Sequence, residues 1–359
     1  MRGADISQPS LFISRTIEDF VPAKHPLRAI RKLIDEALRE LDTQFNRLYA
    51  DEGRESVAPE RLIRASLLQV LYTIRSERQL VEQIRYNMLY RWFVGLEIED
   101  NVWHHATFSK NRERLLDEAL MSRLFQSVLK IARRHHLLSD DHFSVDGTLI
   151  DAWASHKSFK PKDDDNNTPT GKERNFHNER RSNATHQSST DADAELMRKG
   201  KGMEARLRYG VHHLVENRNH LIVDVRTAKA ASVHEREAAL DMLGNIPGEH
   251  HITVGGDKGF DTHDFVGQCR NMNITPHVAC NTERPGGSAL DERTTRHAGY
   301  EISQIKRKMI ETTFGWSKHY GGLRRMMYRG LEKVSARVMF TDIGFNVLRI
   351  SNLVPIEAL

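Results

Sequence analysis

Apolar residues recur at helical spacing from residue 26 to residue 137. The stretch HPLRAIRKLIDEALRELDTQFNRL repeats Leu, Ile and Phe at intervals that place them on one face of a helix. Pro59 opens a second helical stretch, as suits a first-turn proline. Ser76, with a glutamine three residues later, predicts a capping box, and Gly95 predicts a stop. One long helix is predicted over TFSKNRERLLDEALMSRLFQSVLKIARRHH, so this part of the chain is predicted to be all-helical.

After Asp141 the pattern alternates, as it does in strands. FSVDGTLID, ITVGGD and ITPHVAC have the length and the branched residues of strands, and RLRYGVHHLVENRNHLIVDVRTAKA predicts two strands around a turn at 217–219. HEREAALDML, THDFVGQCRNM and residues 301–318 are predicted to be helices. The order is strand, hairpin, helix, strand, helix, strand, helix. That order is typical of a ribonuclease-H-like mixed sheet with helices against its faces.

A polar tract at about residues 156–204 interrupts this order. It includes KPKDDDNNTPTGK and ERRSNATHQSSTDAD, which have almost no means of burying a core, and its acidic triplet Asp163–Asp165 is predicted to be solvated. The predicted fold class is therefore α+β. An all-helical domain at 1–137 precedes a ribonuclease-H-like domain at 138–359, which carries the polar tract as a long insertion or mobile arm.

Positive charge gathers towards the end of the chain. The 359 residues carry a formal net charge of only +4, whereas residues 301–350 hold ten Lys and Arg against four Asp and Glu. Such a region suits a polyanion, although a solubilising face has the same composition. In the helical domain, Lys110, Arg112 and Arg114 are candidate phosphate contacts. That domain is predicted to bind DNA ends or to dimerise, with a helical bundle bearing charged outer faces as the alternative.

Cysteine usage and hydropathy indicate the compartment. Cys269 and Cys280 are the two cysteines, and neither lies in a CxxC motif, so a disulfide framework is excluded and a reducing cytoplasm is predicted. No apolar run approaches the roughly 18 residues that span a membrane. The start, MRGADISQPSLFI, lacks the order of a signal peptide. We expect no membrane partner.

The stretch IETTFGWSKHYGGLRR surrounds one acid, Glu311, with cations. On a helical wheel of residues 301–318, one side is apolar and is predicted to be buried: Ile302, Ile305, Met309, Thr313 and Trp316. The opposite side gathers Gln304, Arg307, Lys308, Glu311, Gly315 and Lys318. Ordinary surface ion pairs would explain part of this stripe. An acid ringed by bases is also the arrangement needed by a metal site beside phosphates.

Three carboxylates from separate predicted elements could form that site. Asp146 lies mid-strand, on the face opposite Phe143 and Val145, because side chains alternate along a strand. Asp257 ends a strand among glycines, and Glu311 projects from the polar stripe. Such oxygen donors suit Mg²⁺, and two ions roughly 4 Å apart can promote in-line displacement at phosphorus.

Each of the two aspartates also has an alternative interpretation. An Asp in a glycine-rich turn is commonly structural. Asp151 is a rival for Asp146, although five residues along a strand reverse the face. Asp261 and Asp264 are rivals for Asp257 but lie beyond its strand.

The chain resembles bacterial insertion-sequence transposases of the DDE class, in the group typified by insertion sequence five. The resemblance runs from HPLR to GLRR, and its most specific pieces are ERLIRASLLQVLYTIRSERQL, YRWFVGL, FSKNRERLL, HFSVDGTLIDAWASHKSF, ERRSNATH, KGKGMEARL, VENRNHLIVDV, GGDKGFD and IETTFGWSK. It maps the acid triad, as catalytic and metal-binding residues, onto Asp146, Asp257 and Glu311. In the family's signature around the third acid, Arg307 and Lys318 fit, whereas Gln304 stands where a Tyr is usual and Tyr300 lies one turn earlier.

The resemblance implies an enzyme, a DNA transposase that binds the terminal inverted repeats of its own insertion sequence. It implies two Mg²⁺ ions, with Mn²⁺ as a substitute, that serve phosphodiester hydrolysis and then strand transfer to target DNA. The expected DNA-binding residues are Arg307, Lys308, Lys318, Arg324 and Arg325. Expected partners are double-stranded transposon ends, target DNA and at least one further copy of the chain, in a bacterial cytoplasm at the nucleoid. The alternatives are a ribonuclease-H-like nuclease without strand transfer and an inactive domesticated DNA-binding protein, against which the presence of all three acids argues.

Overall fold

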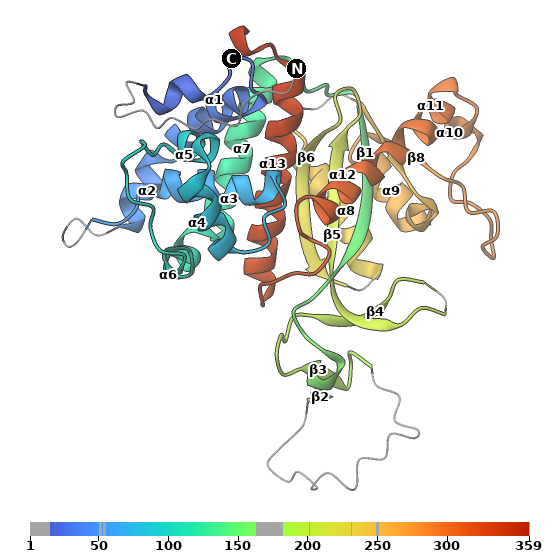
Figure 1. Ribbon diagram of the computed structural model, residues 1–359. Coiled ribbons are helices and arrows are strands. Elements are labelled where there is room, and N and C mark those ends of the chain that lie inside the picture. The colour runs from blue at the N-terminus through green and yellow to red at the C-terminus, as the bar shows by residue number, and fades with distance from the viewer. Residues whose placement is uncertain are drawn as a thin grey trace, which may run out of the picture.

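The computed structural model describes residues 15–49, 52, 55–162, 182–200, 202–230, 232–248 and 251–358. Figure 1 shows a group of helices beside a twisted sheet, with a small arm extending from the lower end of the sheet. The fold is α+β, with a helical N-terminal part followed by a ribonuclease-H-like sheet and its flanking helices. The predicted fold class is confirmed. Asp163–Asp165 and the middle of the polar tract lie outside the described residues.

The N-terminal part consists of short helices separated by capped turns. They are η1 (Ile17–Phe20), α1 (Pro26–Arg39), α2 (Asp42–Leu48), α3 (Pro59–Leu71), α4 (Glu77–Tyr86), α5 (Met88–Val94), α6 (Ala106–Leu115) and α7 (Glu118–Arg134). Two predicted signals are confirmed, since Pro59 begins α3 and Gly95 ends α5 at a φ of 91°. Of the predicted capping box, the structure shows the Ser76 half, in which the Ser76 hydroxyl accepts from Gln79 N at 3.2 Å. The single long helix predicted from residue 107 onwards is wrong. The chain forms two helices over this stretch, because α6 ends at Leu115 and Asp117 caps α7 by accepting from Leu120 N at 2.8 Å.

Six strands form the main sheet. They are β1 (His142–Asp151), β4 (Glu195–Arg198), β5 (Ala205–Glu216), β6 (Leu221–Lys229), β7 (Ile252–Gly256) and β8 (Ile274–Val278). The order is β4-β5-β1-β7-β8, with β6 also paired to β5. β1 is antiparallel to β5 but parallel to β7, and β7 is parallel to β8. β1 pairs with β7 only over its first three residues, so its second half extends past the end of β7.

Helices cover both faces of the sheet and divide the apolar residues into two cores. The remaining elements are η2 (His156–Ser158), α8 (Ser232–Gly244), η3 (Lys258–Phe260), α9 (His263–Asn271), α10 (Glu292–Thr295), α11 (Ala298–Lys306), η4 (Arg307–Met309), α12 (Ile310–His319), α13 (Leu331–Leu353) and η5 (Ile356–Ala358). Phe143 and Val145 of β1 pack with α8 and α9 in one core. The larger core joins the other face of the sheet to α12, α13 and the N-terminal helices. Asp146, which alternates with Val145, therefore belongs to the α12 side.

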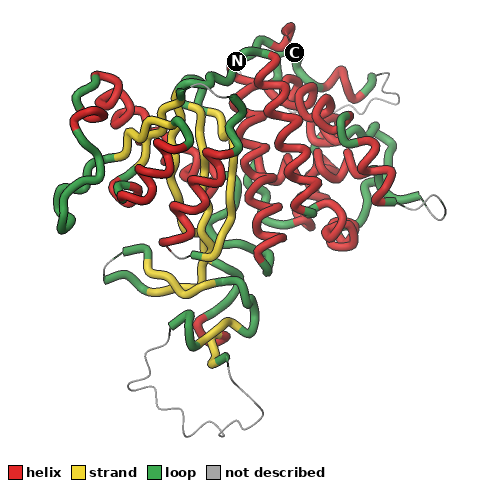
Figure 2. The backbone as a smooth tube through the Cα atoms, turned by 180° about the vertical axis from the view of Figure 1, so that it is seen from behind, coloured by secondary structure: helices red, strands yellow, loops and turns green. Residues whose placement is uncertain are grey.

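The long helix α13 links the two parts of the molecule. It packs against α7, α1 and α3 as well as against β6, and Figure 2 shows the N-terminal helices and α13 gathered on one side of the sheet, with other helices on the opposite side. Asn346 fixes this contact, because its side chain both accepts from Ile222 N at 3.0 Å and donates to Ile222 O at 2.7 Å. The helical core is thus built from both ends of the sequence. No helix within the described ranges is long and apolar enough to cross a bilayer.

The ends of the predicted insertion are folded, which corrects the prediction of a coreless arm for those residues. β2 (Phe159–Pro161) pairs with β3 (His186–Ser188), and β4 adds a strand to the edge of the main sheet. Phe159 is buried, and the Tyr209 hydroxyl donates to Asp191 Oδ1 at 2.6 Å. The described ends of the tract are therefore stabilised by contacts with the sheet.

Candidate active site

Asp146 lies on the part of β1 that extends past β7. Its side chain is partly buried, and its Oδ1 accepts a hydrogen bond from Gly147 N at 2.7 Å. Burial, with smaller contributions from the charges of Asp257 and Glu311, raises the pKa of Asp146 to about 6, against the opposing effects of the Gly147 hydrogen bond and the charge of Arg307. The structure therefore brings the three predicted acids and one predicted cation into a single electrostatic neighbourhood.

Asp257 follows the last residue of β7, one position beyond the strand end that the sequence predicted. It is exposed, and it caps η3 because its Oδ1 accepts from Gly259 N at 2.7 Å. β7 pairs in parallel with the start of β1, so Asp257, which follows β7, lies beside the second half of β1 on the edge that β7 leaves unpaired.

Glu311 is exposed in the first turn of α12. Directly behind it, a buried polar network fixes α12 against β5 and α13. His213 of β5 lies 3.0 Å from Thr313 through Nδ1 and 3.0 Å from Asp342 through Nε2, and both His213 and Asp342 are fully buried. The Ser317 hydroxyl donates to the other Asp342 oxygen at 3.3 Å. His213 is also the β5 neighbour of Asp146 in the sheet, so this network couples the position of α12 to the strand that carries Asp146.

The predicted buried face of residues 301–318 is wrong for its first half. Ile302, Ile305 and Met309 are 55%, 68% and 43% exposed, respectively. The helix is interrupted by the 3₁₀ turn η4, which rotates about 20° more per residue than an α-helix. Three such residues turn the wheel by roughly 60°, so α12 buries Ile310, Phe314 and Ser317 together with Thr313, whose predicted burial is confirmed.

The rival aspartates have structural partners. Asp151 forms ion pairs with Arg208 at 2.8 Å and Arg206 at 3.1 Å. Asp261 is fully buried and accepts from two backbone amides in the loop after β8, those of Asn281 and Ala289. Asp264 lies in the first turn of α9 and accepts from a glutamine one turn later. Their roles in holding the chain together are sufficient to explain these acids.

The cations expected at DNA divide into two groups. Arg307 and Lys308 lie in η4 beside the acids, and Gln304 orients Arg307. The Gln304 amide donates to the His277 carbonyl at 2.7 Å and accepts from Arg307 Nε at 2.9 Å. Tyr300 is turned elsewhere, since its hydroxyl donates to Val278 O at 2.9 Å. Gln304 is therefore the residue that supports Arg307.

The second group lies at the far end of β1. Lys318 is half-buried and donates to the Thr148 hydroxyl at 2.5 Å; burial lowers the pKa of Lys318 to about 8, with a smaller contribution from nearby positive charges. Arg324 accepts through its carbonyl from Asp151 N, and the Arg325 guanidinium lies 4.9 Å from the centre of the Trp153 ring. These cations follow β1 from the acids towards the arm.

A further acid, Glu235, was missed by the sequence interpretation. It lies in the first turn of α8, on the other side of β1, with a partly buried side chain. Burial, with smaller contributions from the charges of Asp257 and Asp146, raises the pKa of Glu235 to about 7, against the opposing charge of Arg236. An acid just inside a helix start is ordinary in sequence, so only the packing of α8 on β1 distinguishes it.

The acid set fits a hard divalent cation by its chemistry. No group of three or more His, Cys, Asp and Glu residues within the described part of the chain is arranged as a ready metal centre. The donors are nevertheless all carboxylates, and the raised pKa of Asp146 results from burial and, to a smaller extent, from repulsion by Asp257 and Glu311. A bound divalent cation would relieve that repulsion. Asp146, Asp257 and Glu311 are the residues that would hold it.

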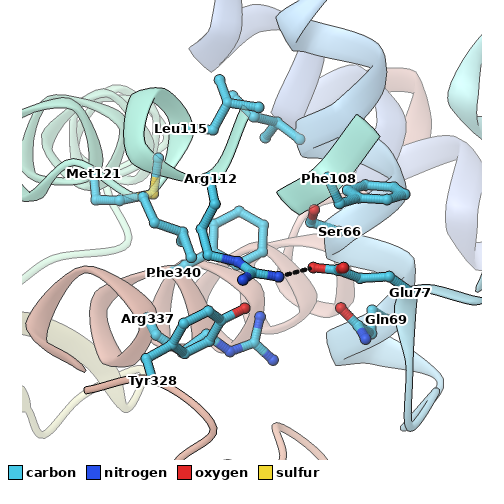
Figure 3. A pocket seen from close by; sticks show the side chains of 12 residues that line it. Ser66, Gln69, Glu77, Phe108, Arg112, Leu115, Met121, Tyr328, Arg337 and Phe340 are labelled. Atoms are coloured by element: carbon cyan, nitrogen blue, oxygen red, sulfur yellow. Dashed lines mark hydrogen bonds and ion pairs between the residues drawn. The ribbon is translucent and has the colours of Figure 1, made fainter. Parts of the chain in front are cut away.

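The candidate phosphate contact Arg112 points into the protein. It forms an ion pair with Glu77 at 2.8 Å in a cavity of about 40 Å³ between the N-terminal helices and the start of α13 (Figure 3). Tyr328 and Arg337 line the same cavity. The Arg114 guanidinium lies 5.2 Å from the centre of the Tyr49 ring, whereas Lys110 is exposed. A cavity of this size holds water rather than a substrate.

The sheet order is that of a ribonuclease-H-like fold, and the family model that matches the sheet region supports an enzyme of the nuclease and transposase class. The chain belongs to the transposase DDE family, since residues 137–343 match the family model described as Transposase DDE domain. Residues 15–114 match a second model, described as Transposase domain (DUF772). Members of the DDE family generally use divalent metals. No curated protein shows significant sequence similarity to this chain.

Solved structures of similar shape include a piggyBac transposase synaptic complex with hairpin DNA. That likeness covers 91% of this chain and 75% of the other, at 6% identity and a TM-score of 0.43. A Mos1 transposase paired-end complex with the left transposon end covers 89% of this chain and 94% of the other, at 12% identity and a TM-score of 0.21. Likenesses this low carry no further argument.

Proposed function

We propose that this chain is the transposase of a bacterial insertion sequence of the insertion-sequence-five type. It binds the terminal inverted repeats of its element and hydrolyses a phosphodiester there. The freed 3′ hydroxyl then attacks a phosphodiester of target DNA, which joins the element end to the target strand and releases a 3′ hydroxyl of that strand. One observation carries the proposal. In a chain of the transposase DDE family, the charges of Asp257 and Glu311 both act on Asp146, although the three residues come from separate elements.

In this proposal Asp146, Asp257 and Glu311 are catalytic and hold two Mg²⁺ ions, for which Mn²⁺ substitutes. The bound ions would supply activation of the attacking oxygen and stabilisation of the leaving oxygen. Asp146 provides a partly buried ligand on β1, whereas Asp257 and Glu311 are exposed and can meet DNA. The His213–Asp342 network holds α12, and with it Glu311, at a fixed distance from β1.

The DNA backbone follows the cations along β1. Arg307 and Lys308 contact phosphates beside the acids, and Lys318, Arg324 and Arg325 contact phosphates towards the arm. Neutralising phosphates releases counterions, which drives binding without reading sequence. The helical domain at 1–137 serves end recognition or dimerisation, and the catalytic domain occupies residues 138–359. Joining two element ends requires at least a dimer on DNA, acting in the bacterial cytoplasm at the nucleoid.

The decisive experiment compares Glu311→Gln with wild type on labelled element ends, with and without Mg²⁺. We expect the variant to bind the ends as wild type does but to lose metal-dependent cleavage, because the amide keeps the shape of the side chain without its charge. Glu301→Gln is a matched control, since Glu301 is exposed on α11 and carries the same charge change. Cleavage by Glu311→Gln at the wild-type rate would refute the assignment.

A strand-transfer assay with pre-cleaved ends and a target plasmid completes the test. Joined products identify a transposase, whereas cleavage without joining identifies a nuclease of the same fold. Specific end binding without cleavage under any divalent metal would identify a DNA-binding protein that has lost its chemistry.

A further inference from the structure

Helix α11 is held against the sheet mainly by polar contacts. Among its residues, all of which the structure describes, Ser303 alone is buried. Tyr300 is half-buried, whereas Ile302 and Ile305 are exposed. A surface helix of a globular protein ordinarily turns an apolar stripe to the core. The position of α11 therefore depends on the hydrogen bonds of a few polar side chains.

The Ser303 hydroxyl joins two strands that lie on either side of β7. It lies 2.7 Å from Nδ1 of His277 on β8 and 2.9 Å from Nε2 of His142 on β1, and it donates to the Gly299 carbonyl at 2.9 Å. A hydroxyl has a single proton to donate, so both imidazole rings donate to its oxygen. The hydrogen-bonding capacity of this side chain is thereby used in full, and α11 is tied to β1 and β8 at one point.

Gly255 of β7 lies beneath this contact. In the sheet it pairs with Ser144 of β1 on one side and with His277 of β8 on the other. A Cβ atom added to Gly255 would lie 3.2 Å from Arg307 Cβ and 3.6 Å from the Ser303 carbonyl oxygen. The chain from Ser303 to Arg307 thus lies directly on the backbone of β7, where a larger residue would hold it further from the sheet.

This close approach places Arg307 on the face of the sheet that carries the acids. Gly255 lies two residues before Asp257, and its partner Ser144 lies two residues before Asp146. Side chains two residues apart along a strand point to the same face. A fixed position of α11 on Gly255 therefore fixes the start of the Arg307 side chain relative to both aspartates.

Gln304 orients the rest of the Arg307 side chain. Its amide donates to the His277 carbonyl at 2.7 Å, and its oxygen accepts from Arg307 Nε at 2.9 Å. Two consecutive residues of α11 thus bond to His277, Ser303 to the ring and Gln304 to the backbone. Within the described ranges, no hydrogen bond involves the two terminal nitrogens of Arg307, and such a planar pair suits a phosphate.

We propose that Ser303 is a positioning residue for Arg307. By joining β1 to β8 across Gly255, it fixes the start of η4 so that the Arg307 guanidinium meets a DNA phosphate beside Asp146 and Asp257. This inference rests on the proposed function, because it deepens the part that Arg307 has in binding element ends. Ser303 itself touches neither the DNA nor the metal.

The salt dependence of DNA binding separates this role from a merely structural one. The full-length protein is titrated onto labelled duplexes of the element ends, without divalent metal and at several salt concentrations. Loss of one phosphate contact lowers the slope of log binding constant against log salt by about 1. We expect this loss for Arg307→Ala and equally for Ser303→Ala, although Ser303 carries no charge. The double variant should show the loss of one contact rather than two.

Ser335→Ala is the matched control. Ser335 is a buried serine of α13, and its hydroxyl donates to Glu118 Oε1 at 2.7 Å. This variant should keep the wild-type slope, because it removes an equally buried hydroxyl that does not hold α11.

The outcomes distinguish this inference from the proposed function. If Ser303→Ala keeps the wild-type slope while Arg307→Ala loses one contact, the positioning role is overturned and the proposed function stands. If Arg307→Ala also keeps the slope, the inference fails together with the assignment of Arg307 to DNA. The metal-dependent cleavage of Glu311→Gln then still decides whether the acids are catalytic.

Gln304→Leu keeps the inference testable if Ser303→Ala does not fold, as judged by thermal melts. Gln304 is half-buried, and leucine has a similar size but forms neither of its two bonds. The variant should therefore release Arg307 while Ser303 stays in place, and its slope should be lower by about 1. An unchanged slope would overturn the inference, because the contact of α11 with His277 would then have no effect on Arg307.

Discussion

Removal of the Asp342 carboxylate is expected to destabilise the protein strongly. Asp342 is fully buried, and it contacts His213 at 3.0 Å through one oxygen and Ser317 at 3.3 Å through the other. Asp342→Ala leaves the His213 ring nitrogen and the Ser317 hydroxyl without this partner inside the core. Leaving two buried polar groups unsatisfied in this way costs about 1–3 kcal/mol for each group, or about 2–6 kcal/mol together. The free energy of unfolding, measured by circular dichroism in urea, should fall by that amount.

The hydrogen-bond directions make Asp342→Asn an informative companion. The Thr313 hydroxyl donates to the Ile310 carbonyl at 2.7 Å, so it accepts from His213 Nδ1. A neutral His213 then presents an acceptor at Nε2, and the side-chain amide that this substitution introduces can donate to it. We therefore expect Asp342→Asn to cost only about 1 kcal/mol, the value of an ordinary hydrogen bond.

The two variants together test the network. Losses that agree within roughly 0.5 kcal/mol, close to the additivity error of such measurements, would refute the reasoning, as would an Asp342→Ala loss of less than about 1 kcal/mol. Because α12 carries Glu311, Asp342→Ala should also lower the cleavage rate in the fraction that remains folded.

Three further outcomes are expected. Burial, with a smaller effect from the neighbouring His142 and His297, lowers the pKa of His277 from 6.5 to about 4. The contribution of neutral His277 to the free energy of unfolding is therefore fully present above pH 6.5 and should fall by roughly 3 kcal/mol as the pH drops towards 4, because only the unfolded chain gains the proton. A His277→Gln variant whose free energy of unfolding shows the same pH dependence as wild type would contradict this. Gly321→Ala should lower the free energy of unfolding by about 1–3 kcal/mol, since the added Cβ would lie 2.2 Å from Thr341 Cγ2 and 2.8 Å from the Ser317 carbonyl oxygen. Gly315→Ala in α12 is the control, because its Cβ meets no atom within 4 Å and the substitution should be neutral or stabilising. Thermal melts of both variants measure the difference. Lys308→Ala should reduce the slope of log binding constant against log salt for element ends by about 1; an unchanged slope would remove Lys308 from the interface.

Local patterns in the sequence specify most of the fold. Alternation identifies β1, β5, β6, β7 and β8, and the cap at Ser76 and the stop at Gly95 are confirmed. These features depend on neighbours a few residues apart, which the sequence displays directly. The edge strand β4 has only a weak alternating pattern and depends on its pairing with β5. The break at Asp117 lies inside a continuous helical pattern and depends on the side-chain cap that starts α7.

The candidate site divides in the same way. The sequence by itself determined that Asp146 and Glu311 sit in a strand and a helix, because period and residue type are local properties. Only the tertiary structure decided that the 3₁₀ turn at 307–309 rotates α12, that Asp151 is committed to arginines, and that Glu235 meets Gly147. These outcomes depend on which backbones pack together across long stretches of chain, and the free energy of such contacts leaves no period in the sequence.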